Sequence, residues 1–130
     1  MTEIVSEDQV PGSVKDALEK KFPGSVADAW TYTAEFEADL TIDGREVEIT
    51  FDQHGQILQI EREIDPSTLP QAIKDTLARD FPTATIDEAE TVEIPDGDLE
   101  FFEVELDEDG ESVEVHICAD GTFLDIDEDL

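Results

Sequence analysis

The chain has 130 residues, 38% of them apolar, which is enough for one compact domain with its own hydrophobic core. Its 37 acidic residues outnumber seven Lys and Arg, so the formal net charge is −30, and residues 65–130 contribute 22 acidic side chains against two basic ones. Because such a field repels phosphate, it disfavours nucleic acids and anionic membranes and favours cations or basic protein surfaces.

The first half of the chain predicts a lead-in segment over residues 1–9, in which Ile4 and Val5 could add to a sheet edge, then one helix and four strands. The helix is expected from about Pro11 to Lys21, because apolar side chains recur there at helical spacing. Strands are expected over residues 26–33, 36–42, 46–52 and 56–64, and Asp43-Gly44 is typical of a two-residue hairpin turn. Apolar and polar residues alternate along these strands, so one face of the sheet is apolar and the other carries carboxylates and threonines.

The second half repeats this order of elements. The segment VPGSVKDALEKKFPGSVAD, which begins at Val10, returns as LPQAIKDTLARDFPTATID, which begins at Leu69. A helix is therefore expected over about 69–80, with Ser67 or Thr68 as its cap, and strands over 85–94, 100–107, 112–118 and 122–126. An insertion lengthens one turn near 94–98, and the acidic run from Asp125 is expected to be a solvated tail.

These patterns predict an α+β fold made of two tandem helix-plus-four-strand antiparallel repeats, 10–64 and 65–130. The repeats would form one compact domain with a sheet of up to eight strands and both helices on one face. No apolar run is long enough to span a membrane, and residues 1–9 lack the pattern of a secretory signal. A cytoplasmic location is therefore one expectation, and a signal outside this sequence is the other.

The motifs of both repeats resemble the PepSY-like domain family, which has the beta-lactamase-inhibitor-protein-like fold. In the first repeat these are Val14-Lys15-Asp16-Ala17-Leu18, Phe22-Pro23-Gly24, Trp30, Phe36-Glu37-Ala38-Asp39-Leu40 and Asp43-Gly44; in the second, Phe81-Pro82, Phe102-Glu103-Val104-Glu105-Leu106 and Asp109-Gly110. The resemblance implies a periplasmic or secreted protein. It also implies functions known among relatives, namely inhibition of enzymes through the open sheet face and binding of metal ions.

The main functional hypothesis is a non-enzymatic module that binds a protein with a basic surface through its acidic sheet face. Carboxylates would raise the association rate and aromatic side chains would add contact energy. The alternative is that the charge only confers solubility or adaptation to salt. The residues expected on the binding face are Tyr32, Glu37, Asp39, Glu46, Glu48, Phe101, Glu103, Glu105, Glu114 and His116.

A second hypothesis is a protein that binds or buffers calcium, a lanthanide or another hard cation, which prefers several oxygen ligands. The expected ligands are Glu37, Asp39, Glu48, Glu103, Glu105 and Glu114. No organic cofactor is expected.

The sequence indicates no catalytic group. His116 and Cys118 lie two residues apart on one strand and share a face, which is a weak indication of a metal or thiol site. His54 falls in a turn and is expected to be solvated. No enzyme activity is therefore predicted.

Overall fold

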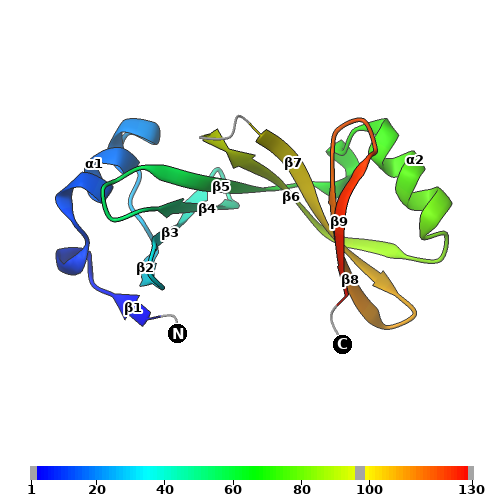
Figure 1. Cartoon of the computed structure of the whole chain (residues 1–130), viewed down its shortest axis with the longest axis horizontal. Helices are drawn as coiled ribbons and strands as arrows, with labels where there is room; N and C mark the ends of the chain where they lie inside the picture. Colours follow the sequence, from blue (N-terminus) through cyan, green and yellow to red (C-terminus); the bar gives the residue numbers. More distant parts are fainter. Residues whose placement is uncertain (1–2, 96–98, 129–130) are drawn as a thin grey trace. The chain divides into compact units, whose positions relative to one another are not determined.

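The computed structural model describes residues 3–95 and 99–128. Within these residues the fold has two α-helices, two short 3-10 helices (η1 and η2) and nine strands, and Figure 1 labels the α-helices and strands. The elements are β1 (Glu3–Val5), η1 (Glu7–Gln9), α1 (Gly12–Lys21), β2 (Ala29–Tyr32), β3 (Phe36–Ile42), β4 (Arg45–Phe51), β5 (Ile57–Ile64), η2 (Pro66–Thr68), α2 (Gln71–Asp80), β6 (Thr85–Ile94), β7 (Leu99–Glu108), β8 (Glu111–Ile117) and β9 (Phe123–Glu128).

The strands follow one another in the sheet in the order of the chain, from β1 to β9. This arrangement confirms the predicted α+β fold with two helix-plus-strand repeats. The sheet has one strand more than the eight expected, because residues of the lead-in segment pair with β2. In this pairing Glu3 lies opposite Tyr32, and Val5 lies opposite Trp30.

The chain divides into two compact units. The first comprises residues 1–62 and 93–99, and the second comprises residues 63–92 and 100–130. The expected assignment of residues 1–9, 10–64 and 65–130 to a lead-in and two repeats of one domain stays a prediction.

In the first unit α1 covers the apolar face of the strands. The carbonyl oxygen of Pro11 accepts hydrogen bonds from the amides of Val14 and Lys15 and so begins the helix. Val14 is fully buried, and the ring of Trp30 lies 6.0 Å from that of Phe51. The buried core of this unit consists of Val10, Val14, Leu18, Trp30, Phe36, Ala38, Leu40, Val47, Ile49, Phe51 and Ile60.

The second unit repeats this packing with α2. Ile73 and Leu77 of the helix are buried among strand residues of the same unit. Phe81, just after the helix, meets Phe123 edge to face with ring centroids 6.3 Å apart. The buried core of this unit consists of Leu69, Ile73, Leu77, Ala89, Val104, Leu106, Val113, Val115 and Ile117.

The two predicted hairpin turns are present. Asp43 and Gly44 have φ angles of 53° and 80°, and Asp109 and Gly110 have φ angles of 53° and 86°. Two consecutive positive φ angles define the turn type whose twist matches that of antiparallel strands. The Asp-Gly pairs therefore fix the registers of β3 with β4 and of β7 with β8.

Three local predictions need correction. Neither Ser67 nor Thr68 caps α2, because its N-cap is Pro70, which makes no side-chain hydrogen bond. The side chain of Asp65 instead caps the short helix η2 by accepting from the Ser67 amide. In the sequence Leu58 alternates in phase with Ile60 and Ile64, which predicts that Leu58 faces the core. A register shift between β4 and β5 turns Ile57 toward the core instead. Residues 125–128 of the expected tail belong to β9, which pairs with β8 as far as Glu128. The predicted insertion at 94–98 lies partly outside the described residues.

Candidate functional site

Each unit has a sheet face opposite its helix, which we call the open face. Side chains alternate between the two faces of a strand. Since Phe36, Ala38 and Leu40 are buried in the core, Glu37 and Asp39 point to the open face. The same alternation places Glu48 on the open face of the first unit. In the second unit Glu103, Glu105, Glu114 and His116 point to the open face.

The open face of the first unit carries the first carboxylate cluster, formed by Glu37, Asp39 and Glu48. One carboxylate oxygen from each residue lies within 4.8 Å of the other two. The register of the hairpin explains this proximity, because Asp39 lies directly opposite Glu48 and Glu37 lies opposite Thr50. All three residues are half-buried. The hairpin thus brings together three of the six residues expected to bind a cation.

Burial and mutual repulsion change the acidity of this cluster. Partial burial, the charge of Glu37 and a hydrogen bond to Glu37 raise the pKa of Glu48 to about 8, with smaller contributions from Glu61 and Asp39. Burial also raises the pKa of Asp39, with the charges of Glu37, Glu46 and Asp28 adding to the effect. Near neutral pH, Glu48 therefore holds its proton in the absence of a cation.

Two neighbours of this cluster were missed in the sequence. Thr31 donates a hydrogen bond of 3.4 Å to Glu37, and Glu61 lies opposite Glu48 in register. Gln59 donates to Glu61 at 2.6 Å. Alternation along β5 would have placed Gln59 and Glu61 on the open face, whereas the position of Thr31 depends on how β2 pairs with β3.

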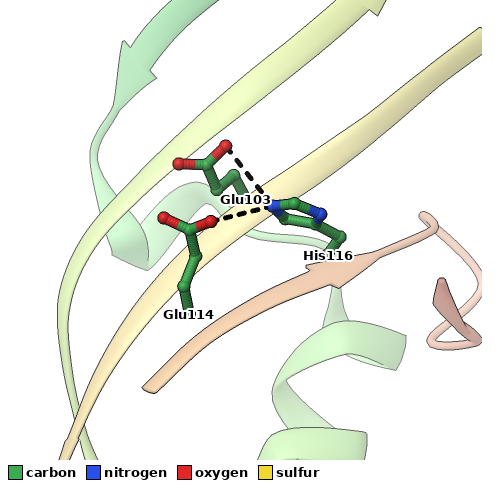
Figure 2. Close-up of side chains that lie close together, drawn as sticks. All are labelled: Glu103, Glu114 and His116. Carbon is green, nitrogen blue, oxygen red and sulfur yellow. Dashed lines mark hydrogen bonds and ion pairs between the residues drawn. The ribbon is translucent and has the colours of Figure 1, made fainter. Parts of the chain in front are cut away.

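The open face of the second unit carries the histidine cluster, formed by Glu103, Glu114 and His116. Figure 2 shows both carboxylates turned toward the imidazole. The Nε2 atom of His116 lies 3.0 Å from Oε2 of Glu114 and 3.5 Å from Oε2 of Glu103. Glu103 lies opposite His116 in the register of β7 and β8, while Glu114 precedes it by two residues on β8.

The two clusters occupy equivalent positions of the two repeats. A shift of 66 positions, set by Asp43-Gly44 and Asp109-Gly110, superposes Glu37 on Glu103 and Glu48 on Glu114. The same shift superposes Thr50 on His116. The second unit therefore has an imidazole where the first unit has a threonine hydroxyl.

The structure places the other expected site residues as follows. Glu105 lies opposite Glu114, and Glu46 is exposed at the turn end of β4. Tyr32 does not lie on the open face, because it follows the buried Trp30 by two residues and packs on the core residue Phe36 at 4.8 Å. Phe101 does lie on the open face.

Among the remaining residues, Phe101 differs from its sequence interpretation and His54 does not. Phe101 is only 9% exposed and packs against the ring of His116, so it offers little contact area. The imidazole of His116 faces the two glutamates, whereas Cys118 lies beyond the end of β8. His54 is exposed in the turn after β4, as expected.

Comparison with protein families and solved structures agrees with this fold. The family model described as "Putative beta-lactamase-inhibitor-like, PepSY-like" matches residues 1–59 and 30–125. No curated protein matches the chain.

Three similar crystal structures come from Bacteroides species. A BLIP-like protein from Bacteroides fragilis has 26% identity and a TM-score of 0.78, over 91% of this chain and 85% of that one. A structure from Bacteroides eggerthii, described as "putative periplasmic proteins", has 18% identity and a TM-score of 0.84, over 92% and 88%. A DUF2874 family protein from Bacteroides uniformis has 18% identity and a TM-score of 0.83, over 91% and 88%.

None of the helices in the described part of the chain is long and apolar enough to cross a bilayer.

Proposed function

Because this chain belongs to the PepSY-like family of beta-lactamase-inhibitor-like proteins, we propose that it is a non-enzymatic binding module whose open face binds a protein with a basic surface. The observation that carries the proposal is the concentration of half-buried carboxylates on the face that each helix leaves uncovered. Likeness to a BLIP-like protein supports binding rather than catalysis. Charge complementarity of this kind raises association rates and selects partners.

The charge of the whole chain is a competing explanation, so the test separates the open face from net charge. One variant carries Glu37→Gln, Glu46→Gln, Glu103→Gln and Glu105→Gln on the open faces. A matched control carries Glu7→Gln, Asp8→Asn, Asp16→Asn and Asp75→Asn, which lie in or next to helices. Both variants lose four negative charges.

The measurement is affinity capture of basic proteins from an extract of the source cells, followed by titration of each captured protein against all three chains. We expect at least one protein to bind the wild type and the control equally and to bind the open-face variant more weakly. Equal weakening in both variants would instead attribute binding to net charge.

A second candidate function is binding of a hard cation at the first carboxylate cluster. The specific observation is the crowding that raises the pKa of Glu48, since a bound cation would displace the proton and relieve the repulsion. Calcium or a trivalent lanthanide should raise the unfolding midpoint beyond a control of matched ionic strength. Glu48→Gln should reduce that difference, and an unchanged difference would exclude this cluster as the site.

The proposal includes a periplasmic or secreted location. It is supported by the family resemblance and by the description of the similar Bacteroides eggerthii structure. Fractionation of the source cells with an antibody against the chain tests it, and recovery with cytoplasmic markers would contradict it.

A further inference from the structure

We propose that the histidine cluster of the second unit, Glu103, Glu114 and His116, binds a divalent transition metal such as Zn²⁺, with one imidazole and two carboxylates as ligands. The site is specific to the second unit, because the equivalent position of the first unit holds Thr50. It uses residues of β7 and β8 alone and does not depend on the proposed protein partner.

The spacing of the donor atoms fits a single small metal ion. Zn²⁺ lies about 2.0–2.2 Å from nitrogen and oxygen ligands, so two of its ligands in tetrahedral geometry are roughly 3.3 Å apart. The Nε2 atom of His116 lies 3.0 Å from one glutamate oxygen and 3.5 Å from the other. All three donor atoms lie within 4.8 Å of one another. The ligands therefore need only small movements to meet a common ion, with a water molecule as the fourth ligand.

The imidazole is held in place by groups outside the cluster. The ring of Phe101 packs on the ring of His116 with centroids 5.4 Å apart and planes inclined at 49°. Phe101 is itself 9% exposed, and the side chain of His116 is 23% exposed. Packing of this kind restricts the imidazole before a metal arrives, so less conformational entropy is lost on binding. Partial burial also weakens the competition from water for the ligands.

The donor types select the class of metal. An imidazole nitrogen is a ligand that suits zinc, copper, nickel and iron, whereas calcium takes six to eight oxygen ligands. Two carboxylates also balance the charge of a divalent ion. The first carboxylate cluster has only oxygen donors at the corresponding positions. The two repeats thus present different ligand chemistry on the same hairpin framework.

The chain contains two histidines, which makes a direct test possible in the wild-type protein. Nitrogen-15 spectra of the imidazoles are recorded while one equivalent of ZnCl₂ is added in excess MgCl₂, which occupies the diffuse negative field. We expect the Nε2 resonance of His116 to shift with one-to-one stoichiometry, while His54 is unchanged. No shift at His116, or equal shifts of both histidines, would overturn the proposal.

Variants then measure the contribution of the imidazole. His116→Thr gives the second unit the residue of the first, and His54→Thr is the matched control. Zinc affinity is measured by titration against a competing dye. Loss of a residue that only supports a metal ligand weakens metal affinity by roughly 10–100-fold, so loss of the ligand itself in His116→Thr should weaken zinc binding by more than that. His54→Thr should bind like the wild type. Equal affinity of His116→Thr and the wild type would overturn the site. If His116→Thr does not fold, the spectra of the wild-type chain decide.

Calcium provides a control for metal class. A large excess of CaCl₂ should leave the zinc-shifted resonance of His116 in place. Complete reversal of the shift at a low ratio of calcium to zinc would show a site without transition-metal preference and would overturn the proposal.

Discussion

The two units have the same hairpin register but carry different chemistry on their open faces. In the first unit Asp39 lies opposite Glu48, and in the second Glu105 lies opposite Glu114. The buried core of each unit is apolar on its strands, whereas a hydroxyl on the open face of the first unit becomes an imidazole in the second. The comparison shows that the core and the Asp-Gly turns determine the fold, so the open face can change without altering it.

The largest expected effect tests the cores of the two units. Phe51 and its counterpart Ile117 are both fully buried. Phe51→Ala should lower the free energy of unfolding by about 3–5 kcal/mol, and Ile117→Ala by about 2–5 kcal/mol, through lost burial and a residual cavity. Urea unfolding measures both. Val26, which is 78% exposed, provides the control, and Val26→Ala should cost less than about 0.5 kcal/mol. Equal costs for Phe51→Ala and Val26→Ala would contradict the described core.

The second largest expected loss of stability tests the glycine turn that packs against the helix in each unit. Gly55 has a φ angle of 89°, and a methyl group there would overlap the carbonyl oxygen of Ser13 in α1. Gly110 has a similar φ angle of 86° but open space around it. Gly110→Ala should therefore lower the free energy of unfolding by about 1–2 kcal/mol, which is the backbone strain of a side chain at positive φ. Gly55→Ala should lower it by about 3 kcal/mol or more, because the overlap with α1 adds to that strain. If thermal unfolding shows equal losses, the turn after β4 does not touch the helix as described.

Gly121 is the counterpart of Gly55 in the second unit. A methyl group there would lie 2.6 Å from the Thr76 hydroxyl and 2.8 Å from the Ala72 carbonyl oxygen. Gly121→Ala should therefore also cost more than Gly110→Ala.

Much of this fold was predictable because the signals are local and occur twice. Both helices end within a residue of their expected ends, and β3 and β6 have the predicted bounds. For the lead-in segment the sequence offered Ile4 and Val5 as an addition to a sheet edge but no bounded strand, because Glu3–Val5 is too short for a pattern to show. The inward turn of Ile57 arises from a register shift, and no feature of residue composition marks where such a shift occurs.

The candidate site was predictable as a face but not as clusters. Alternation placed Glu103, Glu114 and His116 on one side of the sheet. Which carboxylates meet depends on the register, which puts Glu103 opposite His116. The burial of Phe101 beside that imidazole also depends on which strands are neighbours, and the sequence does not show this. The interpretation of Phe101 as an exposed contact residue therefore disagrees with its burial in the structure.

A smaller effect tests the first carboxylate cluster. Glu48 keeps its proton up to about pH 8 in the folded chain, whereas an ordinary glutamate loses it near pH 4.3. Folding therefore binds a proton between these values, and the contribution of Glu48 to stability is full at low pH and is lost as the pH rises through about 8. Glu48→Gln, which stays neutral, should be more stable than the wild type at pH 9 by about 1–2 kcal/mol, since partial exposure screens the interaction.

The pH dependence of unfolding distinguishes this effect from a general reduction of charge. Near pH 4 the wild type and Glu48→Gln should have equal stability. Asp43→Asn, which removes one charge from an exposed turn, is the control for a general reduction of charge. If Glu48→Gln were more stable than the wild type by the same amount at every pH, the gain in stability would come from packing and not from the titration of the cluster.

The smallest effect tests a hydrogen bond that is specific to the second unit. Thr76 of α2 is 7% exposed, and its hydroxyl donates to the Gly121 carbonyl oxygen at 3.0 Å. Its counterpart in α1 is Ala17. Thr76→Ala should lower the free energy of unfolding by about 1 kcal/mol, because the partly buried carbonyl of Gly121 loses this donor. Ala17→Thr should gain less than about 0.5 kcal/mol, because the lower helix propensity of threonine offsets a new bond. The free energy of unfolding is measured in urea for both substitutions. If neither changes it, the hydrogen bond contributes no net stability, and the contacts of α1 and α2 with their glycine turns are equally stable despite the different side chains.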